Sequence, residues 1–261
     1  MSELLKGAPV AAAISGELQK RCAALKDSGI VPCTAILRVG ERPDDLAYER
    51  AALKRLDSIG IAVKQFILPA GCSRKDLLSV IDGINADSSV HGCLMFRPLP
   101  DKQLEKEASE KLLTCKDIDC MTSGSLASVF SGSDTGFPPC TAQAVIEMCD
   151  HYGIGLEGRN VVVIGRSLVI GRPVSMLLQQ RNATVTMCHT RTKDLPAICR
   201  RADIIIAAAG HPGLVTAEYV SSAQIIIDVG INVSSDGHVS GDVYLESVEP
   251  VVSSEIGRAH V

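Results

Sequence analysis

The chain has 261 residues, of which 46% are hydrophobic and 21% charged, and its formal net charge is −4. This length suffices for two modest domains or one large one. The acidic balance excludes an electrostatic footprint for nucleic acid or an anionic membrane, so we expect neither partner. No apolar run approaches the ~18 residues of a membrane span, and the N-terminus lacks the apolar core of a signal peptide. We therefore expect a cytoplasmic protein.

Ten cysteines are scattered along the chain, and none forms a Cys-x-x-Cys pair. Several lie inside apolar runs, which is typical of small buried hydrophobic residues in a reducing compartment. We therefore predict neither a metal site nor a disulfide framework.

The first half of the chain alternates strand patterns with helical patterns. Strands are predicted over residues 34–39, 62–68 and 91–96, and helices over 44–59 and 74–86. This β-α-β-α-β series implies a parallel sheet covered by helices.

A turn-rich break over residues 132–139 ends the first half. A helix is predicted over 141–152, with Thr141 as its N-cap, and joins the halves. The second half repeats the alternation, with helices predicted after Gly171 and around 194–201. Its strands are predicted over residues 160–164, 183–188, 203–207 and 223–228. The sequence therefore predicts an α/β protein whose second half is a small doubly wound, Rossmann-like parallel sheet.

The segment over residues 161–173 carries the clearest chemical signal. An apolar, β-branched run breaks at Gly165, passes through Arg166 and Ser167, and restarts at Gly171 with Pro173 following in a helix. A buried strand that runs into a helix N-terminus presents free backbone N–H groups to a phosphate. The spacing is Gly-x-Ser-x-x-x-Gly, a moderately specific pattern that predicts a nucleotide cofactor.

The end of the next strand bears on which nucleotide is bound. In NAD-preferring folds an acidic residue there binds the ribose 2′-hydroxyl. Here the strand is followed by Thr190 and Arg191, without an acid, and together with Arg166 this favours the 2′-phosphate of NADP over NAD. The alternative is that Arg191 is a solvated surface cation.

Two further turns follow the third and fourth strands of this half, at Gly210 and before Ile231. Ligands in open α/β sheets lie at the carboxyl ends of strands, so these turns either approach the nicotinamide or are simply tight turns. His189 and His211 have either a catalytic or a structural role.

With these pieces in order, the chain resembles the methylenetetrahydrofolate dehydrogenase/methenyltetrahydrofolate cyclohydrolase family. The resemblance spans nearly everything from residue 36 to residue 242. The matching stretches are Tyr48 with Lys54, His91-Gly92, Pro98-Leu-Pro100, Lys116-Asp-Ile-Asp119, Pro139-Cys-Thr141, Gly165-Arg-Ser167 through Gly171-Arg-Pro173, Cys188-His-Thr190, Asp228-Val-Gly-Ile-Asn232 and Gly241-Asp-Val243.

The resemblance implies a folate-binding catalytic domain over residues 1–140, an NAD(P)-binding domain over 141–254, a cleft between them, and a homodimer. It implies that Tyr48 and Asp119 are catalytic, and that both bind tetrahydrofolate derivatives together with Pro98. The cofactor-binding residues that we expect are Gly165, Arg166, Ser167, Gly171, Pro173, Thr190, Arg191, Gly210 and Ile231.

The chain departs from the family at the residues that activate water. The family lysine one helical turn after the tyrosine is Ala52 here, and Lys54 lies roughly 120° around the helix from Tyr48. Phe96 replaces a glutamine, Arg97 an apolar residue and Cys120 a glycine. We therefore expect NADP-dependent oxidation of 5,10-methylenetetrahydrofolate, with cyclohydrolase activity weak or absent.

Two alternatives stay open. The first is a non-enzymatic folate- or nucleotide-binding relative, and the second is a two-domain dehydrogenase of the shikimate type acting on another small substrate. The last seven residues, 255–261, resemble a translated sequencing adapter. We therefore expect them to be a non-native tail that contributes nothing to the fold, and the natural C-terminus to be missing.

Overall fold

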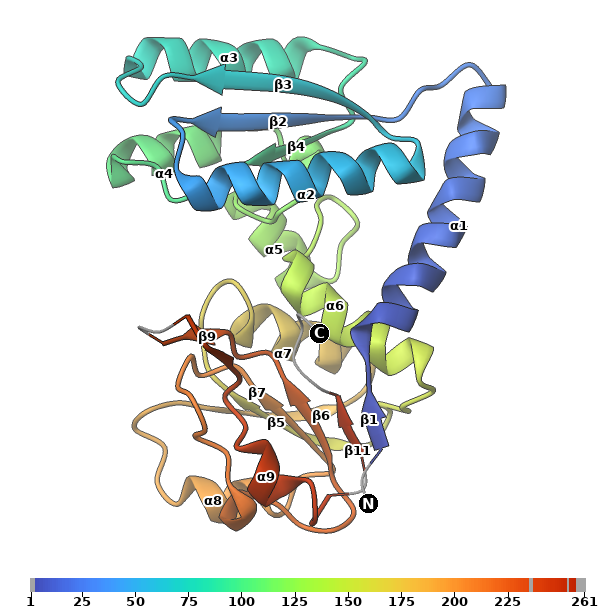
Figure 1. The fold of residues 1–261 in the computed structure, drawn as a ribbon, viewed down its shortest axis with the longest axis vertical. Helices are drawn as coiled ribbons and strands as arrows, with labels where there is room; N and C mark the ends of the chain where they lie inside the picture. Colours follow the sequence, from blue (N-terminus) through green and yellow to red (C-terminus); the bar gives the residue numbers. More distant parts are fainter. Residues whose placement is uncertain (1–2, 235–236, 253, 257–261) are drawn as a thin grey trace. The chain divides into compact units, whose positions relative to one another are not determined.

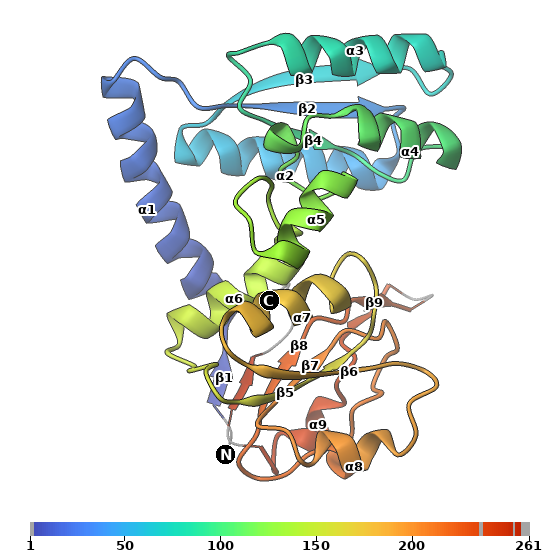
Figure 2. The same cartoon turned by 180° about the vertical axis from the view of Figure 1, so that it is seen from behind.

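The computed structural model describes residues 3–234, 237–252 and 254–256 (Figures 1 and 2). The chain divides into two compact units. The first unit is Ala12–Cys140, and the second unit combines Met1–Ala11 with Thr141–Val261. Each unit has its own parallel sheet and its own buried core.

The first unit is built on a three-stranded parallel sheet in the order β3-β2-β4. The strands are β2 (Cys33–Val39), β3 (Ala62–Leu68) and β4 (Gly92–Met95), which confirms the three predicted strands to within one or two residues at each end. The helices are α2 (Pro43–Ile59), α3 (Arg74–Ala86), α4 (Lys102–Lys111) and α5 (Ser123–Ser131), with the short helix η1 (Thr114–Lys116).

Successive residues of β2 face opposite sides of this sheet, as a strand's two-residue repeat requires. Ala35, Leu37 and Val39 lie in one core with Leu77 and Ile81 of α3. On the other face Arg38 pairs with Glu49 of α2. Helices therefore cover both faces of the sheet, with α3 and α2 on opposite sides of the strands in Figure 1.

Helix α2 is a continuous helix whose ends follow from its sequence. Pro43 occupies the first turn, where a missing N–H costs nothing, and Asp44 and Asp45 lie near the positive end of the helix dipole. Gly60 ends the helix in a left-handed conformation with φ 91°, donating to the carbonyls of Leu56 and Asp57.

The second unit has a six-stranded sheet in the order β1-β11-β8-β7-β5-β6, with every pair parallel. The strands are β1 (Glu3–Leu5), β5 (Asn160–Ile164), β6 (Thr184–Cys188), β7 (Ile204–Ala207), β8 (Ile225–Asp228) and β11 (Ser254–Ile256), and β9 (Asn232–Val233) forms a separate antiparallel pair with β10 (Val239–Ser240). The helices are α6 (Cys140–His151), α7 (Gly171–Gln180), α8 (Leu195–Cys199), η2 (Ala217–Tyr219) and α9 (Leu245–Val248). Helix α1 (Gly7–Asp27) begins in this unit. By the division above, α1 continues into the first unit.

Alternate residues of the central strands pack into two different cores, one on each face of this sheet. Val161, Val163 and Ile206 pack with α6 and α7 on one face. Val162 and Ile205 pack with α8 and α9 on the other, and Figure 2 shows these helix pairs on opposite sides of the strands. The predicted doubly wound sheet is confirmed, with its four predicted strands.

Three boundaries differ from the sequence expectations. Helix α6 begins at Cys140, so Thr141 lies inside it and is not its N-cap. Strand β1 pairs with β11, so the first residues belong to the second unit rather than to a domain over 1–140. Glu255 and Ile256, which we had assigned to a non-native tail, form β11 with backbone pairing to β8, whereas residues 257–261 lie outside the described residues. A three-residue strand has too weak a pattern to be seen in the sequence.

All ten cysteines lie in the described part of the chain as free thiols, and seven of them are buried. Within the described residues, no three His, Cys, Asp or Glu side chains gather as metal ligands do. No helix among those residues is long and apolar enough to cross a membrane.

Candidate functional site

At two positions of the loop between β5 and α7, only glycine fits. Gly165 has φ +137°, and a Cβ there would lie 2.1 Å from the carbonyl oxygen of Ala208. A Cβ on Gly171 would lie 2.3 Å from the carbonyl oxygen of Gly165. The two glycines of the Gly-x-Ser-x-x-x-Gly pattern therefore bring three stretches of backbone into close approach.

Helix α7 begins at this loop without a side-chain cap. Its N-cap residue, Ile170, makes no side-chain hydrogen bond to the helix. In the first turn Pro173 has no N–H and the Arg172 N–H donates to the carbonyl of Ser167, which leaves the N–H of Gly171 for a ligand. Ser167 shapes the loop, because its Oγ accepts from the N–H of Ile170 at 3.2 Å and its carbonyl accepts from Arg172 at 3.0 Å. The positive end of a helix dipole behind a tight glycine turn suits the pyrophosphate of a dinucleotide.

The strand order places this loop at the point where ligands bind in open α/β sheets. Strand β5 lies between β6 and β7, so the chain leaves β5 toward one side and later returns on the other. The turns after β6, β7 and β8 share the carboxyl edge with Gly165, and they carry Thr190, Arg191, Gly210 and Ile231. The predicted cofactor residues therefore come together along one edge of one sheet.

His189 holds the turn that follows β6. Its Nδ1 accepts from the N–H of Arg191 at 3.1 Å, and its own N–H donates to Thr192 Oγ1 at 2.8 Å. Of the two roles predicted for His189, catalytic and structural, these hydrogen bonds support the structural one. Thr190 and Arg191 are exposed at the tip, and among the described residues neither Arg191 nor Arg166 has a carboxylate partner.

Sequence reasoning assigned no role to Asp242, which organises two of these turns. It is fully buried and accepts from the successive N–H groups of Ala209, Gly210 and His211 at 2.6, 2.9 and 2.9 Å. It also accepts from the Asn232 side chain at 2.9 Å. The signal was present in the quoted Gly241-Asp-Val243 stretch, but only the fold shows which N–H groups the carboxylate meets.

Asp228, at the end of β8, supports Asp242. It accepts from the N–H groups of Gly230, Asp242 and Val243 at 3.0, 3.0 and 3.2 Å. Burial raises the pKa of this carboxyl above its ordinary value. The turns at Gly210 and Gly230 are thus held from behind by two buried carboxylates.

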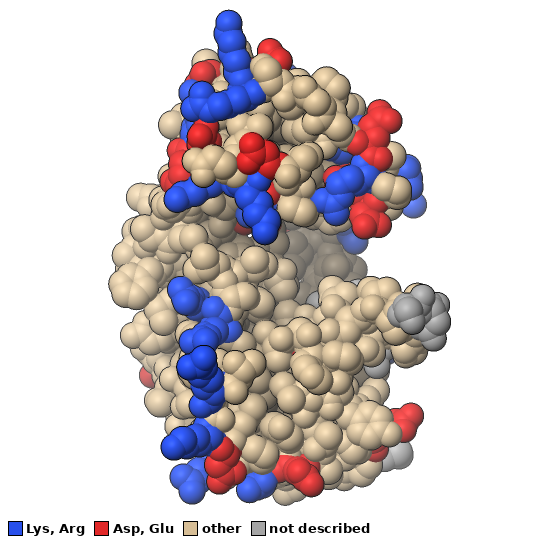
Figure 3. Space-filling view, turned by 90° about the vertical axis from the view of Figure 1, so that its left-hand side faces the viewer, with Lys and Arg blue, Asp and Glu red and all other residues tan. Residues whose placement is uncertain are grey.

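Figure 3 shows one face of the molecule in space-filling form. On the second unit, Lys and Arg side chains form a line beside a broad area of uncharged residues. A positive line of this kind attracts an anionic ligand.

In the first unit, Tyr48 and Phe96 form an aromatic pair. Their ring centroids are 5.4 Å apart with an interplanar angle of 56°, and Phe96 is buried whereas Tyr48 is 59% exposed. Because α2 is unbroken, Ala52 lies one turn after Tyr48 on the same helix face. Lys54 is exposed on another part of the helix surface.

Two buried residues build the loop that carries Asp119. Lys116 Nζ donates to the carbonyls of Ile84, Asn85 and Asp87 at 2.6, 3.0 and 2.8 Å, which ties the loop to the C-terminal end of α3. Asp117, fully buried, accepts from the N–H groups of Met121 and Thr122 and from Ser125 Oγ. Lys116 and Asp117 are therefore structural.

Asp119 itself faces Arg97. Arg97 Nη2 lies 3.1 Å from Asp119 Oδ2, and each side chain is 32% exposed. Cys120 follows in a left-handed conformation with φ 54°, where the family pattern has a glycine. Burial, with a further contribution from Asp117 and Asp119, raises the pKa of the Cys120 thiol to about 12.

The electrostatics connect Tyr48 with Asp119. Although the Tyr48 side chain is largely exposed, partial burial of its phenol raises its pKa above the ordinary value, and the charges of Asp119 and Cys140 raise it further. Burial and Asp119 likewise raise the pKa of the Cys140 thiol. Tyr48 is therefore a neutral hydroxyl donor at ordinary pH. Pro98 follows Phe96 and Arg97 in the chain, and its carbonyl accepts from Arg42 Nη1 at 3.2 Å.

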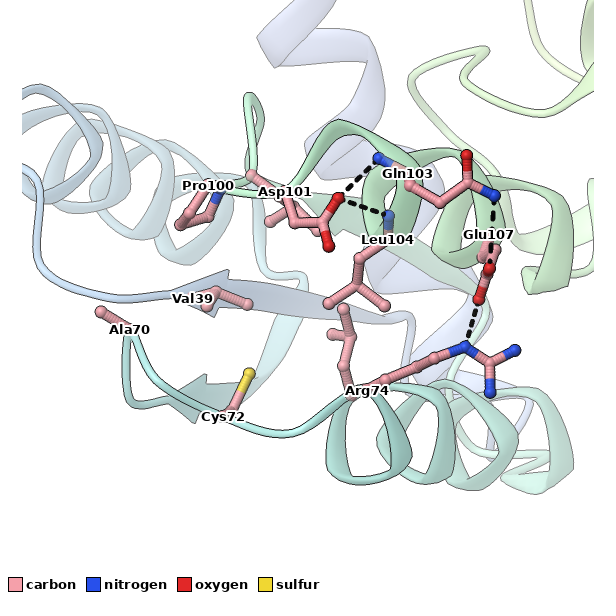
Figure 4. Close-up of a pocket in the computed structure, with 11 residues that line it drawn as sticks. Val39, Ala70, Cys72, Arg74, Pro100, Asp101, Gln103, Leu104 and Glu107 are labelled. Carbon is pink, nitrogen blue, oxygen red and sulfur yellow. Dashed lines mark hydrogen bonds and ion pairs between the residues drawn. The ribbon is translucent and has the colours of Figure 1, made fainter.

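A separate cavity of about 250 Å³ lies behind Leu99 and Pro100, next to α3 and α4 (Figure 4). Its charged side chains are engaged already. Asp101 accepts from the N–H groups of Gln103 and Leu104, and Arg74 pairs with Glu107. We therefore assign the candidate folate contacts to Tyr48 and Asp119 rather than to this cavity.

Comparison with known proteins agrees with both halves of this description. Residues 139–256 match the sequence family described as tetrahydrofolate dehydrogenase/cyclohydrolase, NAD(P)-binding domain, and residues 5–119 match the catalytic domain of the same family. The bifunctional protein FolD of Carboxydothermus hydrogenoformans is 48% identical over 254 residues, which cover 97% of this chain and 88% of that protein.

Two crystal structures have the same fold. Bifunctional FolD from Campylobacter jejuni superposes with a TM-score of 0.92 at 36% identity, covering 98% of this chain and 91% of that chain. The Trypanosoma brucei methylenetetrahydrofolate dehydrogenase-cyclohydrolase, in complex with NADP and an inhibitor, has a TM-score of 0.88 at 30% identity, covering 98% and 90%.

Proposed function

This chain belongs to the tetrahydrofolate dehydrogenase/cyclohydrolase family, and we propose that it oxidises 5,10-methylenetetrahydrofolate with NADP while hydrolysing the methenyl product poorly. The family assignment makes the second unit an NAD(P)-binding domain. The preference for NADP and the loss of hydrolysis are the finer parts of the proposal, and each depends on residues of this chain.

The preference for NADP is supported by the turn after β6. His189 and Thr192 hold this turn so that Thr190 and Arg191 are exposed, and Arg166 is exposed in the loop after β5. A guanidinium binds a phosphate through charged, often bidentate hydrogen bonds. The phosphate loop itself, with Gly165 and Gly171, serves either dinucleotide.

The dehydrogenase step makes modest demands on the protein. The bound nicotinamide supplies the hydride acceptor. Removing a hydride from the carbon between the two folate nitrogens leaves an amidinium cation, and no proton has to move. Tyr48, packed on the buried Phe96, offers an exposed aromatic surface for the flat ring, and Asp119 accepts hydrogen bonds from it. Positioning of this kind accounts for much of the acceleration of such a step.

Hydrolysis demands more, because water must lose a proton as it adds to the amidinium carbon and a ring nitrogen must gain one. The single observation that carries the proposal is the unbroken helix α2, in which Ala52 stands one turn after Tyr48. A methyl group transfers no proton, and Phe96 is an apolar neighbour of Tyr48. Loss of a positioned acid or base costs about 10²–10⁴-fold in rate.

The test measures the two half-reactions separately on the purified protein. We expect reduction of NADP with methylenetetrahydrofolate, accumulation of the methenyl product, and a slower reaction with NAD. Prompt appearance of formyltetrahydrofolate would contradict the loss of hydrolysis. Folate binding without any NADPH formation would favour a non-catalytic relative instead.

A gain-of-function variant sharpens the test. Ala52→Lys places an ammonium one helical turn from Tyr48, and we expect it to raise methenyl hydrolysis by roughly tenfold or more. Ala47→Lys is the matched control, because it adds the same charge to an exposed position of α2 about 100° around the helix from Tyr48. Equal effects of the two variants would contradict the role assigned to position 52.

A further inference from the structure

The ion pair between Arg97 and Asp119 is too exposed to water to act as a stabilising core interaction. Arg97 Nη2 and Asp119 Oδ2 are 3.1 Å apart, and each side chain is 32% exposed. Ion pairs this accessible to water contribute little to stability. By contrast, the buried pair of this unit, Arg38 with Glu49, has side chains only 5% and 7% exposed.

The pair leaves hydrogen-bonding capacity unused. A guanidinium carries five N–H donors in a planar fork, and within the described residues Asp119 is the group with which Arg97 pairs. A carboxylate accepts through two oxygens; the contact to Arg97 uses Oδ2, and the Cys140 thiol also donates to Asp119. The remaining guanidinium donors thus lie beside a carboxylate, and both side chains are partly exposed.

This donor–acceptor edge lies beside the aromatic pair. Arg97 follows Phe96 in the chain, and the Phe96 ring lies against Tyr48. The charge of Asp119 raises the pKa of Tyr48, so the carboxylate lies close enough to interact electrostatically with that ring. A flat heterocycle on Tyr48 would have its edge near Arg97 and Asp119.

We infer that Arg97 is a specificity-determining residue that reads the lactam edge of the pteridine ring together with Asp119. The edge of a 4-oxopteridine has a carbonyl acceptor next to a ring N–H and an amino donor. Arg97 donates to the 4-oxo group, and Asp119 accepts from the ring N–H or the amino group. This assignment rests on the proposed function, since it concerns the substrate of that same site.

The inference predicts discrimination between two ligands that differ at one position. A 2,4-diaminopteridine folate analogue replaces the acceptor carbonyl with an amino donor, which would face the Arg97 donors. Sites built to pair with a polar group reject analogues that cannot pair with it. The unaltered protein, saturated with NADP, should therefore bind tetrahydrofolate more tightly than the diamino analogue.

The test is calorimetric titration of Arg97→Met and Arg97→Lys with both ligands. We expect Arg97→Met to lose roughly tenfold or more of the preference for the 4-oxo ligand, and Arg97→Lys to retain part of it. The matched control is Arg74→Met, which removes the exposed pair of Arg74 with Glu107 in the same unit and should leave the preference unchanged.

The outcomes separate the two proposals. Equal loss of affinity for both ligands in Arg97→Met, or an unchanged preference, would overturn the role of Arg97 while leaving the proposed function intact. If the unaltered protein binds neither pteridine, the proposed function fails and this inference fails with it. Circular dichroism of each variant checks that it is folded.

Discussion

Gly165 and Gly171 stand where a single methyl group would collide with backbone oxygen, so we expect cofactor binding to depend strongly on both. An alanine at position 165 would also need the left-handed backbone at φ +137°. Neither problem is relieved by a side-chain rotation, because the neighbouring atoms belong to the main chain. The loop must therefore deform.

For Gly165→Ala we expect a loss of about 1–3 kcal/mol in the free energy of unfolding. Because 1.4 kcal/mol is tenfold in affinity, we also expect a KM for NADP raised by roughly tenfold or more. Urea denaturation and initial-rate kinetics measure the two quantities. Gly83→Ala is the control, since Gly83 is exposed within α3 with nothing within 4 Å of an added Cβ. That variant should gain about 0.5–1 kcal/mol, and a similar loss in both would contradict the argument.

Tyr48 gives a pH prediction. Its pKa in the folded state lies above the ordinary value, first because the phenol is partly buried and second because of the negative charge of Asp119. As the pH rises, the unfolded chain loses this proton first, so its contribution to stability is present below about pH 10 and is lost as the pH rises through the raised folded value.

The chain contains four tyrosines and no tryptophan, so ultraviolet absorbance follows tyrosinate formation directly. We expect Tyr48→Phe to remove, from the titration of the folded protein, one tyrosine ionisation that occurs at high pH. We also expect it to lessen the loss of stability at alkaline pH. Tyr219→Phe is the control, because it removes one phenol from the other unit. An unchanged titration in Tyr48→Phe would contradict the assignment.

At the scale of the elements, a buried ion pair fixes helix α2 on its sheet. Arg38 Nε of β2 lies 2.9 Å from Glu49 Oε2, and Gln65 of β3 donates to Glu49 Oε1 at 2.9 Å. Arg38 also donates to the carbonyl of Gly40. Since Glu49 follows Tyr48 directly, this network sets where the candidate folate residues stand.

Breaking such a pair leaves a charge buried without its partner. For Glu49→Ala we expect a loss of about 3–5 kcal/mol, measured by urea denaturation. Arg74→Ala, at an arginine whose side chain is 68% exposed, should change stability by less than about 1 kcal/mol. If the two variants lose the same amount, the buried pair does not anchor the helix.

At the scale of the whole molecule, the two units have separate cores and different expected ligands. We expect calorimetry to resolve two unfolding transitions, with NADP raising the temperature of one of them. A ligand at 100 times its dissociation constant stabilises the state it binds by about 2.7 kcal/mol. Gly165→Ala should lose this shift, and equal shifts of both transitions with NADP would contradict independent units.

The homodimer and the cleft between the two domains stay predictions that the resemblance implies. Light scattering of the purified chain tests the first. Ordered binding of folate and NADP, measured with one ligand present in excess, bears on the second.

By itself, the sequence determined the two parallel sheets, the glycine loop after β5 and the absence of a lysine one turn after Tyr48. These features depend on patterns within short stretches of chain, such as alternation in strands, helical spacing, and glycines at a turn. The loop after β5 was predictable because backbone crowding permits only glycine there.

Only the tertiary structure decided which groups pair with the charged side chains and which sheet each short strand joins. Asp242 meets three N–H groups more than thirty residues away, Arg97 meets Asp119, and β1 joins β11 from the other end of the chain. Such contacts leave no periodic trace, because they depend on which turns the folded sheets bring to one edge. The roles of Lys116 and Asp117 as supports of Asp119 appear for the same reason only in the fold.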